Sequence, residues 1–209
     1  KIHKEGYKFL AISILTTFII LIFSKFLGYI FILITAWVYY FFRDPERYSI
    51  NDDKFLVSPA DGLITDISER SGPEELRLEN TTYTKVSIFM NVFNCHVNRT
   101  PTSGIVEEIY YKPGKFLNAS LDKASEENER NYFKIKSVSK DEEIIIVQIA
   151  GLIARRIVCE VEQGQELKQG NRVGMIRFGS RIDMYFKNKK VLAKLGQNVI
   201  AGESLIASD

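Results

Sequence analysis

The chain begins with two long apolar runs. Phe9 to Phe23 and Phe26 to Phe42 contain no charged residue, and only Ser24 and Lys25 separate them. As helices that rise about 1.5 Å per residue, the two runs would reach about 22 and 26 Å, a little short of the ~30 Å hydrocarbon core of a bilayer. We therefore predict a helical hairpin that anchors the chain in a membrane, with Lys25 at the turn.

Basic residues flank this hairpin at both of its ends. Lys1, Lys4 and Lys8 precede the first run, and Arg43 and Arg47 follow the second. Because cytoplasmic flanks of membrane helices are enriched in Lys and Arg, both ends are predicted to be cytoplasmic. The second run and the lack of a small-residue cleavage site argue against a cleaved signal peptide. A buried helical hairpin in a soluble protein is the remaining alternative.

Beyond the hairpin the pattern changes. Arg43-Asp44-Pro45 ends the second run, since proline disfavours helix at the residue before it, and we place a boundary between an anchor of residues 1–47 and a domain of residues 48–209. Short apolar runs rich in β-branched residues and separated by Gly, Pro and Asn predict a mostly-β domain. The charged segment Asn118 to Asn131 is predicted as a loop or short helix. The predicted strands cover Leu63–Ile67, Lys85–Phe93, Ile105–Tyr111, Ile144–Ala150, Ile153–Val161, Val173–Phe178, Arg181–Phe186 and Val191–Leu195.

Two segments of the predicted β domain repeat each other. Gly164 to Gly170 and Gly196 to Gly202 share the pattern Gly-Gln-x-apolar-x-x-Gly. Similar pairs occur in lipoyl- and biotinyl-type barrel-sandwich domains, so we predict a barrel-sandwich-like core. The likeness also raises an alternative function, a membrane-anchored carrier module with a prosthetic group on a hairpin lysine. Lys187, Lys189 and Lys190 are the candidates for that lysine.

Composition and charge narrow the classes of function. The 209 residues carry a net charge of +2, with basic and acidic residues interspersed, which gives no concentrated basic face for nucleic acid. Cys95 and Cys159 form neither a metal-type pair nor a disulfide framework and fit a reducing compartment. Since His3 and His96 are the only histidines, no zinc site is predicted.

The dipeptide Gly179-Ser180 carries the most distinctive candidate chemistry. It lies between the apolar run Val173–Ile176 and the alternating run Ile182–Phe186, where one strand passes to another. Glycine tolerates strained backbone angles that bring the next hydroxyl onto the preceding carbonyl carbon. A serine held in this way can act as an internal nucleophile. The alternative is an ordinary turn, because Gly-Ser is a common turn dipeptide.

The residues around this dipeptide resemble a known processing site. Arg177-Phe178-Gly179-Ser180-Arg181-Ile182-Asp183-Met184-Tyr185 looks like the self-cleavage site of the short form of the phosphatidylserine decarboxylase family, which are pyruvoyl-dependent membrane lipid enzymes. Further blocks resemble that family in the same order along the chain. These blocks are Phe41–Pro45, Ser58–Gly62, His96–Pro101, Gly114–Arg130 and Ala154–Ile157.

This resemblance implies decarboxylation of phosphatidylserine to phosphatidylethanolamine, a step of phospholipid biosynthesis, at the cytoplasmic face of the cell membrane. The Ser180 hydroxyl would attack the Gly179 carbonyl to give an ester, and loss of the Ser180 α-proton and hydrolysis would leave a pyruvoyl group. Chains 1–179 and 180–209 would form a heterodimer, with a further oligomer left open. The pyruvoyl ketone would form a Schiff base with the serine headgroup and accept electrons as carbon dioxide leaves, without a metal. An ether-linked serine lipid is the alternative substrate.

The resemblance also implies roles for other residues. Asp61 resembles the aspartate of the self-cleavage machinery, and the alternative from the residues alone is an ordinary turn, because Asp-Gly after proline is common turn chemistry. His96 corresponds to the family's first histidine and would touch the departing carboxylate or return a proton to the α-carbon. Arg99 stands where the longer form has a second histidine, so the residue that activates Ser180 is left open. Substrate binding is expected from Asn98, Arg99, Arg155 and Arg156, since the planar guanidinium suits a phosphate or carboxylate.

Overall fold

The computed structural model describes residues 1–115, 127–137, 142–151, 156–177 and 180–209. Within these residues the chain divides into two compact units. The first comprises Lys1–Glu46 with Phe93–Cys95, and the second comprises Arg47–Val92 with His96–Asp209. In the described residues, both α-helices belong to the first unit and all named strands belong to the second.

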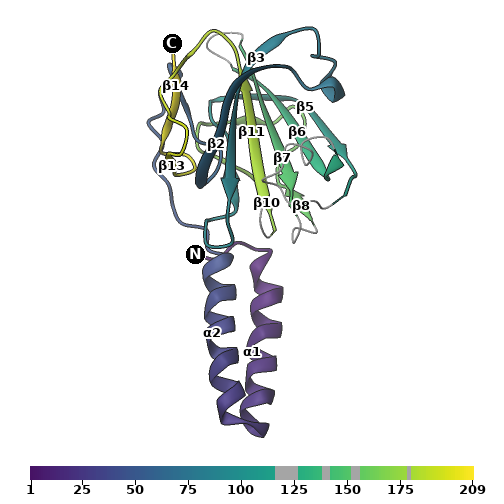
Figure 1. The fold of residues 1–209 in the computed structure, drawn as a ribbon, viewed down its shortest axis with the longest axis vertical. Helices are drawn as coiled ribbons and strands as arrows, with labels where there is room; N and C mark the ends of the chain where they lie inside the picture. Colours follow the sequence, from purple (N-terminus) through teal and green to yellow (C-terminus); the bar gives the residue numbers. More distant parts are fainter. Residues whose placement is uncertain (116–126, 138–141, 152–155, 178–179) are drawn as a thin grey trace. The chain divides into compact units, whose positions relative to one another are not determined.

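The first unit is a hairpin of two apolar helices (Figure 1). Helix α1 spans Gly6–Phe23 and α2 spans Lys25–Phe41, with Ser24 between them. The Ser24 hydroxyl accepts a hydrogen bond from the Leu27 amide at 3.4 Å and so caps α2. Of the helices described, α1 alone is long and apolar enough to cross a membrane by length and composition. The predicted pair of helices is confirmed, whereas their role as a membrane anchor stays a prediction.

Small and hydroxylated side chains allow the two helices to pack closely. The hydroxyls of Ser13 and Thr17 lie 2.6 and 2.8 Å from the Thr35 hydroxyl. Gly28 approaches Leu21 so closely that a Cβ at position 28 would overlap the leucine side chain. Many large apolar side chains elsewhere on both helices are exposed. Such an extended apolar surface marks an interaction site for a membrane or another protein.

The second unit is built almost entirely from strands. One short 3-10 helix, η1 (Glu74–Leu76), follows the second strand. The strands are β1 (Phe55–Val57), β2 (Gly62–Ser71), β3 (Thr82–Met90), β4 (Val97–Arg99), β5 (Gly104–Lys112), β6 (Arg130–Ser137), β7 (Glu143–Ala150), β8 (Ile157–Cys159), β9 (Glu166–Leu167), β10 (Arg172–Ile176), β11 (Ser180–Phe186), β12 (Lys190–Val191), β13 (Asn198–Val199) and β14 (Leu205–Ser208).

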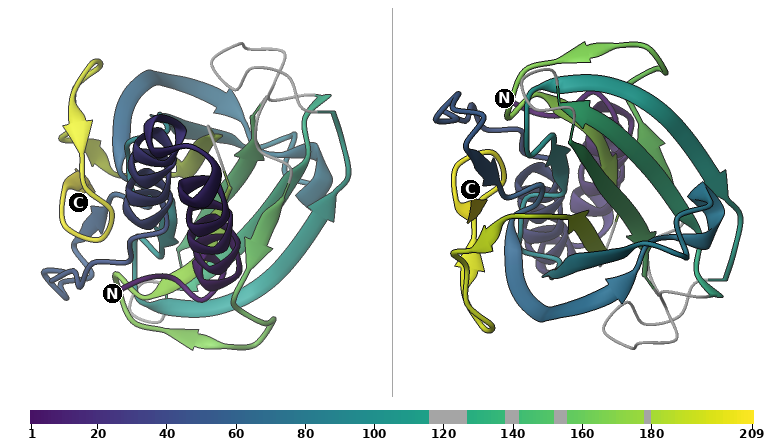
Figure 2. Two further views of the ribbon diagram at one scale, coloured as in Figure 1. Left: turned by 90° about the horizontal axis from the view of Figure 1, so that it is seen from below. Right: turned by 90° about the horizontal axis from the view of Figure 1, so that it is seen from above.

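These strands form three antiparallel sheets. The largest has the order β13-β2-β3-β11-β7-β6-β5-β9, and its strands curve around the core in both views of Figure 2. The two smaller sheets have the orders β1-β14-β12 and β4-β10-β8. Strand β11 lies in the middle of the large sheet, where it pairs with β3 on one side and β7 on the other. The residue that begins β11 is Ser180, so the candidate nucleophile belongs to the centre of the fold.

The residues of β11 alternate between two faces of the large sheet. Ile182, Met184 and Phe186 pack into the main apolar core, and we call this side the core face. The alternate residues Arg181, Asp183 and Tyr185 point to the opposite side, the outer face, because successive side chains of a strand alternate. A second apolar cluster lies on the outer face, and Leu76 of η1 packs into it.

The repeated Gly-Gln segments occupy equivalent places at opposite edges of the large sheet. Strand β9 of the first segment pairs with β5, and β13 of the second pairs with β2. The two turns meet at Gly170 and Gly202, whose φ angles of 79° and 77° lie in the left-handed region that favours glycine. A Cβ on Gly202 would lie 3.5 Å from the Gly170 Cα. The sequence repeat thus joins the two edges of the curled sheet, while the barrel-sandwich resemblance stays a prediction.

The mostly-β fold is confirmed, but several strand bounds differ from the prediction. Strand β2 continues to Ser71, and the predicted strand Val191–Leu195 shortens to β12. Strand β6 was missed because Lys134 and Lys136 interrupt its apolar pattern. Lys134 is stabilised by Glu107 and Glu143 carboxylates at 3.1 and 3.4 Å. Residues 118–126 of the predicted loop and residues 152–155 lie outside the described residues, and Arg130 and Asn131 at the end of that loop belong to β6 instead.

Candidate active site

Ser180 is the first residue of the central strand β11, at the level where the neighbouring strands β3 and β7 end, and it is fully buried. Its Cα partners are Met90, the last residue of β3, and Ala150, the last residue of β7. All three residues have no solvent exposure. The Ser180 hydroxyl donates to the Met90 Sδ atom at 3.9 Å. Because a thioether is a weak acceptor, the hydroxyl is held loosely in a site that is buried from solvent.

A buried carboxamide reaches the same sulfur atom. Asn98 belongs to β4 and is fully buried. Its Nδ2 atom donates to Met90 Sδ at 3.6 Å, and its Oδ1 atom accepts from Gln148 Nε2 at 2.9 Å. The structure thus brings Asn98 and Ser180, which are far apart in the sequence, to one sulfur atom.

His96 directly precedes β4 and is also fully buried. Its carbonyl accepts a hydrogen bond from the Ile176 amide at 3.3 Å, at the end of β10. Because side chains alternate along an extended segment, His96 and Asn98 lie on the same side of it. The fold therefore holds the imidazole in the interior, beside the strand that leads toward Ser180.

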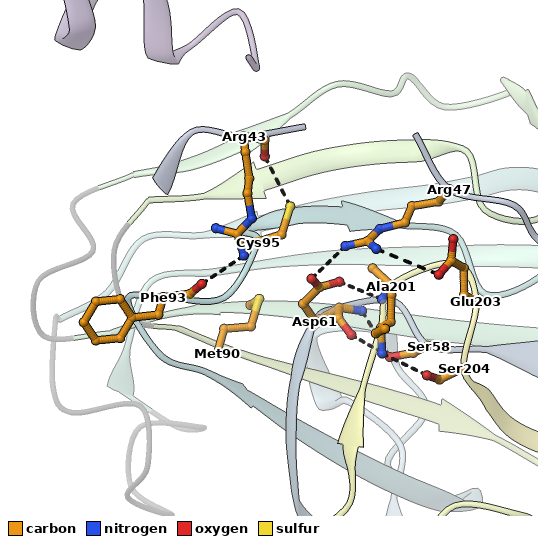
Figure 3. A network of polar contacts seen from close by, with 12 residues as sticks. Arg43, Arg47, Ser58, Asp61, Met90, Phe93, Cys95, Ala201, Glu203 and Ser204 are labelled. Atoms are coloured by element: carbon orange, nitrogen blue, oxygen red, sulfur yellow. Dashed lines mark hydrogen bonds and ion pairs between the residues drawn. The ribbon is translucent and has the colours of Figure 1, made fainter. Parts of the chain in front are cut away.

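Asp61 lies in the turn before β2, where two partners hold its carboxylate (Figure 3). Its Oδ1 atom accepts from the Ala201 amide at 2.8 Å, and its Oδ2 atom accepts from the Arg47 guanidinium at 2.9 Å. Arg47 also lies 3.8 Å from the Glu203 carboxylate. Among the described residues, Asp61 makes no hydrogen bond to Ser180.

The positions of β2 and β11 explain this separation. Strand β3 lies between them in the large sheet, and neighbouring strands are about 4.8 Å apart, so the backbones of β2 and β11 are about 10 Å apart. Asp61 and Ser180 both lie at the strand end where β3 finishes with Met90. The carboxylate is therefore near the serine but does not contact it.

The predicted arginines lie in different places. Arg99 is buried, and its guanidinium donates to the Gly170 carbonyl at 2.8 Å, where the two glycine turns meet. Arg156 is exposed, and its carbonyl accepts from the Arg177 amide at 3.2 Å. Arg156 thus lies beside the segment that leads to Ser180. Arg155 and Gly179 fall outside the described residues.

A cavity of about 700 Å³ lies on the outer face of the large sheet, and Ser180 is not among the described residues that line it. Its walls include a largely buried ion pair between Arg130 and Glu75 at 3.2 Å. Burial raises the pKa of Tyr132 and Tyr185 above the ordinary range for tyrosine. Burial would also raise the pKa of Glu75, but the hydrogen bond from Lys112 and further partners outweigh it and lower that pKa. These three perturbed groups therefore lie on the face of the sheet opposite Ser180.

Sequence reasoning missed three residues of the site, which are Met90, Gln148 and Asn131. A signal for Gln148 exists in the sequence. Its strand, β7, places Ile144, Ile146 and Ala150 on the core face, and Gln148 interrupts that apolar alternation. Among the described residues, no group of three His, Cys, Asp or Glu side chains is placed to hold a metal ion.

Comparison with known proteins identifies close relatives. The sequence pattern of the family described as "Phosphatidylserine decarboxylase" matches residues 34–207. The chain is 64% identical over 207 residues to a phosphatidylserine decarboxylase proenzyme of Pelagibacter ubique (strain HTCC1062), a match that covers 99% of this chain and 96% of the relative. It is 50% identical to a protein of the same name from Rickettsia akari (strain Hartford), covering 99% of this chain and 89% of the relative.

Proposed function

Because this chain belongs to the phosphatidylserine decarboxylase family, we propose that it converts phosphatidylserine to phosphatidylethanolamine with a pyruvoyl group formed from Ser180. Its relatives are named proenzymes, which supports a precursor that must be processed. The observation that carries the proposal is the buried Ser180 hydroxyl at the start of the central strand. A serine at that position has a nucleophilic oxygen next to its own peptide bond and is shielded from competing water.

Self-cleavage begins when the Ser180 oxygen bonds to the carbonyl carbon of Gly179. The bond from that carbon to the Ser180 nitrogen breaks, which leaves an ester and a free amino group. Removal of the Ser180 α-proton then breaks the Cβ–O bond and releases chain 1–179 with a carboxylate end. Water displaces the nitrogen as ammonia and leaves the pyruvoyl ketone. The neighbours of Ser180 support these steps because they exclude bulk water without binding the hydroxyl tightly.

The residues around position 180 fit a pyruvoyl group. That group has nearly the size of the serine it replaces, and Met90 and Ala150 provide an apolar surround. The Asn98 Nδ2 atom, which contacts Met90 Sδ, offers a hydrogen-bond donor for a carbonyl oxygen. When present, the group supplies the electron-accepting ketone for loss of carbon dioxide.

The other predicted residues take separate roles in this proposal. Asp61 supports self-cleavage without contacting Ser180, by holding the negative charge of its carboxylate near the strand end where Ser180 lies. His96 acts in decarboxylation, because its imidazole is buried on the Asn98 side of its segment. Arg156, which is exposed, binds the substrate phosphate together with Arg155, whereas Arg99 holds the Gly170 carbonyl and keeps the fold of the site.

The sheet topology supports a stable complex of the two proposed chains. Chain 180–209 begins with β11, whose seven residues pair with β3 and six of which also pair with β7. Both neighbours belong to chain 1–179. A central strand with partners on two sides cannot leave without breaking the sheet, so cleavage yields a tightly held heterodimer.

The hairpin supports a membrane location. We assign residues 1–47 as a membrane anchor and residues 48–209 as the catalytic domain at the cytoplasmic face. Exposed apolar side chains cover both helices, and burial of apolar area in lipid is favourable. An anchored enzyme meets its lipid substrate at the surface where that lipid resides.

Intact mass and N-terminal chemistry of the purified protein test the proposal. The wild-type protein should give two chains, of which the smaller resists Edman degradation because its N-terminus is a ketone. Ser180→Ala should remain one chain of 209 residues, because the attacking oxygen is gone. The carrier-module alternative would instead give one full-length chain with an added prosthetic mass.

Ser87→Ala is the matched control. Ser87 is also a fully buried serine, but it pairs with Asp183 on the outer face of the large sheet. This variant should cleave as the wild type does. Cleavage of Ser180→Ala at the same bond would refute the proposed role of Ser180.

A further inference from the structure

Three buried carboxamides form a chain across the core face toward Ser180. Asn131 Nδ2 donates to Gln148 Oε1 at 3.2 Å, and Gln148 Nε2 donates to Asn98 Oδ1 at 2.9 Å. Asn98 Nδ2 then donates to Met90 Sδ, the atom that also accepts from Ser180 Oγ. All donors in this chain point in one direction, so its last amide presents NH₂ rather than oxygen to the sulfur beside Ser180.

Backbone pairing and a glycine place the Gln148 side chain close to Ser180. Gln148 pairs with Ile182 of β11, and Ser180 pairs with Ala150 two residues along the same strand. The two side chains therefore lie on the same face, one row apart. Gly174 pairs with Asn98, and a Cβ at position 174 would lie 3.3 Å from Gln148 Nε2 and would overlap the Val158 carbonyl. A side chain at position 174 would press against the Gln148 amide.

A free asparagine amide can rotate by 180° and exchange its oxygen for its NH₂ group. The donor from Gln148 removes this freedom, because only the Asn98 oxygen can accept it. An unpaired amide in an apolar interior costs about 1–3 kcal/mol, which is enough to select one orientation. Gln148 thus determines which atom of Asn98 lies beside Met90 Sδ and Ser180.

We propose that Gln148 is a positioning residue for self-cleavage, because it directs the Asn98 NH₂ group toward the reaction centre at Ser180. This inference rests on the proposed function and specifies what orients the Asn98 amide beside Ser180. Attack by the serine oxygen builds negative charge, and a preorganised donor stabilises that charge. Met90 Sδ is a weak acceptor that holds the donor before the reaction and releases it easily to a stronger one. With the oxygen of Asn98 turned inward, the same charge would be repelled.

Gln148→Glu is the sharpest test, because an ionised carboxylate accepts but does not donate. It would pull the Asn98 NH₂ group toward position 148 and turn the Asn98 oxygen toward Ser180. Removal of one such donor typically slows a reaction by about 10²–10³, and we expect self-cleavage at pH 8 to slow by at least tenfold. Burial raises the pKa of a carboxyl group, so acidification should protonate it and restore a donor. Cleavage of this variant should therefore accelerate by at least tenfold between pH 8 and pH 6.

Two further variants separate positioning from simple damage. Gln148→Leu removes the donor permanently and should cleave slowly at both pH values. Gln169→Glu places the same substitution at another buried glutamine, whose amide donates to the Phe55 and Pro101 carbonyls. It should cleave at the wild-type rate, without acceleration by acid. His96 lies on the same side of its segment as Asn98, and a histidine can itself change charge between pH 6 and pH 8. The cleavage rate of each variant is therefore divided by the wild-type rate at the same pH.

The outcomes distinguish this inference from the proposed function. Cleavage is followed by the loss of the full-length chain in protein whose circular dichroism matches the wild type. Wild-type protein that never cleaves would refute the proposed function. Wild-type protein that cleaves, beside folded Gln148→Leu protein that cleaves within twofold of it, would overturn the positioning role alone. If Gln148→Glu protein does not fold, Gln148→Leu carries the test.

Discussion

On its core face, β11 places Ser180 among uncharged groups, whereas on its outer face it carries the ion pair of Arg181 with Asp183, and Asp183 lines the outer-face cavity. Ser180 contacts a thioether and lies near carboxamides in an apolar surround. Arg181 instead forms a two-point ion pair with Asp183, at 2.9 and 3.1 Å. Neighbouring residues of a single strand thus face opposite environments.

This difference shows what kind of site the chemistry requires. Cavities with perturbed pKa values are the usual guide to catalytic residues, and the outer-face cavity contains such groups. The proposed reaction of Ser180 uses the protein's own backbone as its first substrate and occurs once. It requires an oriented hydroxyl and the exclusion of water around Ser180, while the charge of Asp61 acts from a distance. The core face meets that requirement, and the outer face contributes stability.

Among the variants that test this comparison, Asp61→Asn is expected to have the largest effect, on the rate of self-cleavage. The substitution keeps the size of the side chain but removes the charge that Arg47 contacts at 2.9 Å. Loss of a general acid or base typically slows a reaction by ~10²–10⁴, so uncleaved chain should accumulate. The fraction of uncleaved chain over time, measured by mass spectrometry, checks this expectation.

Two other variants sharpen the Asp61 result. Glu203→Gln removes the second carboxylate beside Arg47, at 3.8 Å, and should cleave normally if Asp61 itself is required. His96→Ala should give two chains yet turn over lipid at least tenfold more slowly, because His96 is assigned to decarboxylation. An uncleaved His96→Ala protein beside a normally cleaved Asp61→Asn protein would reverse the two roles.

Much of the fold could be predicted from local patterns. The apolar runs around Ser24 predict the helical hairpin, and alternation in Ile182 to Phe186 predicts β11. Strand β6 could not be recognised in this way, because Lys134 within it is stabilised by Glu107 and Glu143 from other strands. Pairing between strands distant in the sequence supplies information that periodicity lacks.

The site was predictable only in part, for a related reason. The Gly179-Ser180 dipeptide and its flanking motif identify the nucleophile within the sequence. The contacts of Ser180 with Met90 and of Asn98 with Gln148 join residues that are 90 and 50 positions apart. No local pattern predicts such contacts. Gln148 carried only a weak signal, as one polar residue in an apolar face.

Asp183→Asn on the outer face is expected to have a smaller effect, on the free energy of unfolding and not on self-cleavage. Hydrogen bonds to charged groups contribute about 1.5–3 kcal/mol, and Asp183 makes a buried two-point contact with Arg181. The variant should lose about 2 kcal/mol of unfolding free energy in urea denaturation but retain self-cleavage. Asp66→Asn, whose partner Lys85 lies at 2.9 Å but whose carboxylate is more exposed, should lose less than about 1 kcal/mol. A cleavage defect in folded Asp183→Asn protein would remove the distinction between the faces.

The smallest effect concerns the pH dependence of stability, and it is expected from Glu75→Gln. Burial alone would raise the pKa of Glu75, but the hydrogen bond from Lys112 and the charge of Arg130 bring that pKa below the ordinary value for a glutamate. A carboxyl group whose pKa is lower in the folded state stabilises the protein above its unfolded pKa. That contribution disappears as the pH falls through the folded pKa.

Glu75→Gln should therefore be less stable than the wild type at pH 7, and the difference should vanish as the pH falls well below 4.5. Urea unfolding at a series of pH values measures both curves. Glu74→Gln, at the exposed neighbouring residue, is the matched control and should follow the wild type throughout. Equal curves for Glu75→Gln and the wild type would show that the ion pairs of the outer-face cavity do not stabilise the fold. Because Glu75 lies on the face opposite Ser180, cleavage should be unchanged in both variants at neutral pH.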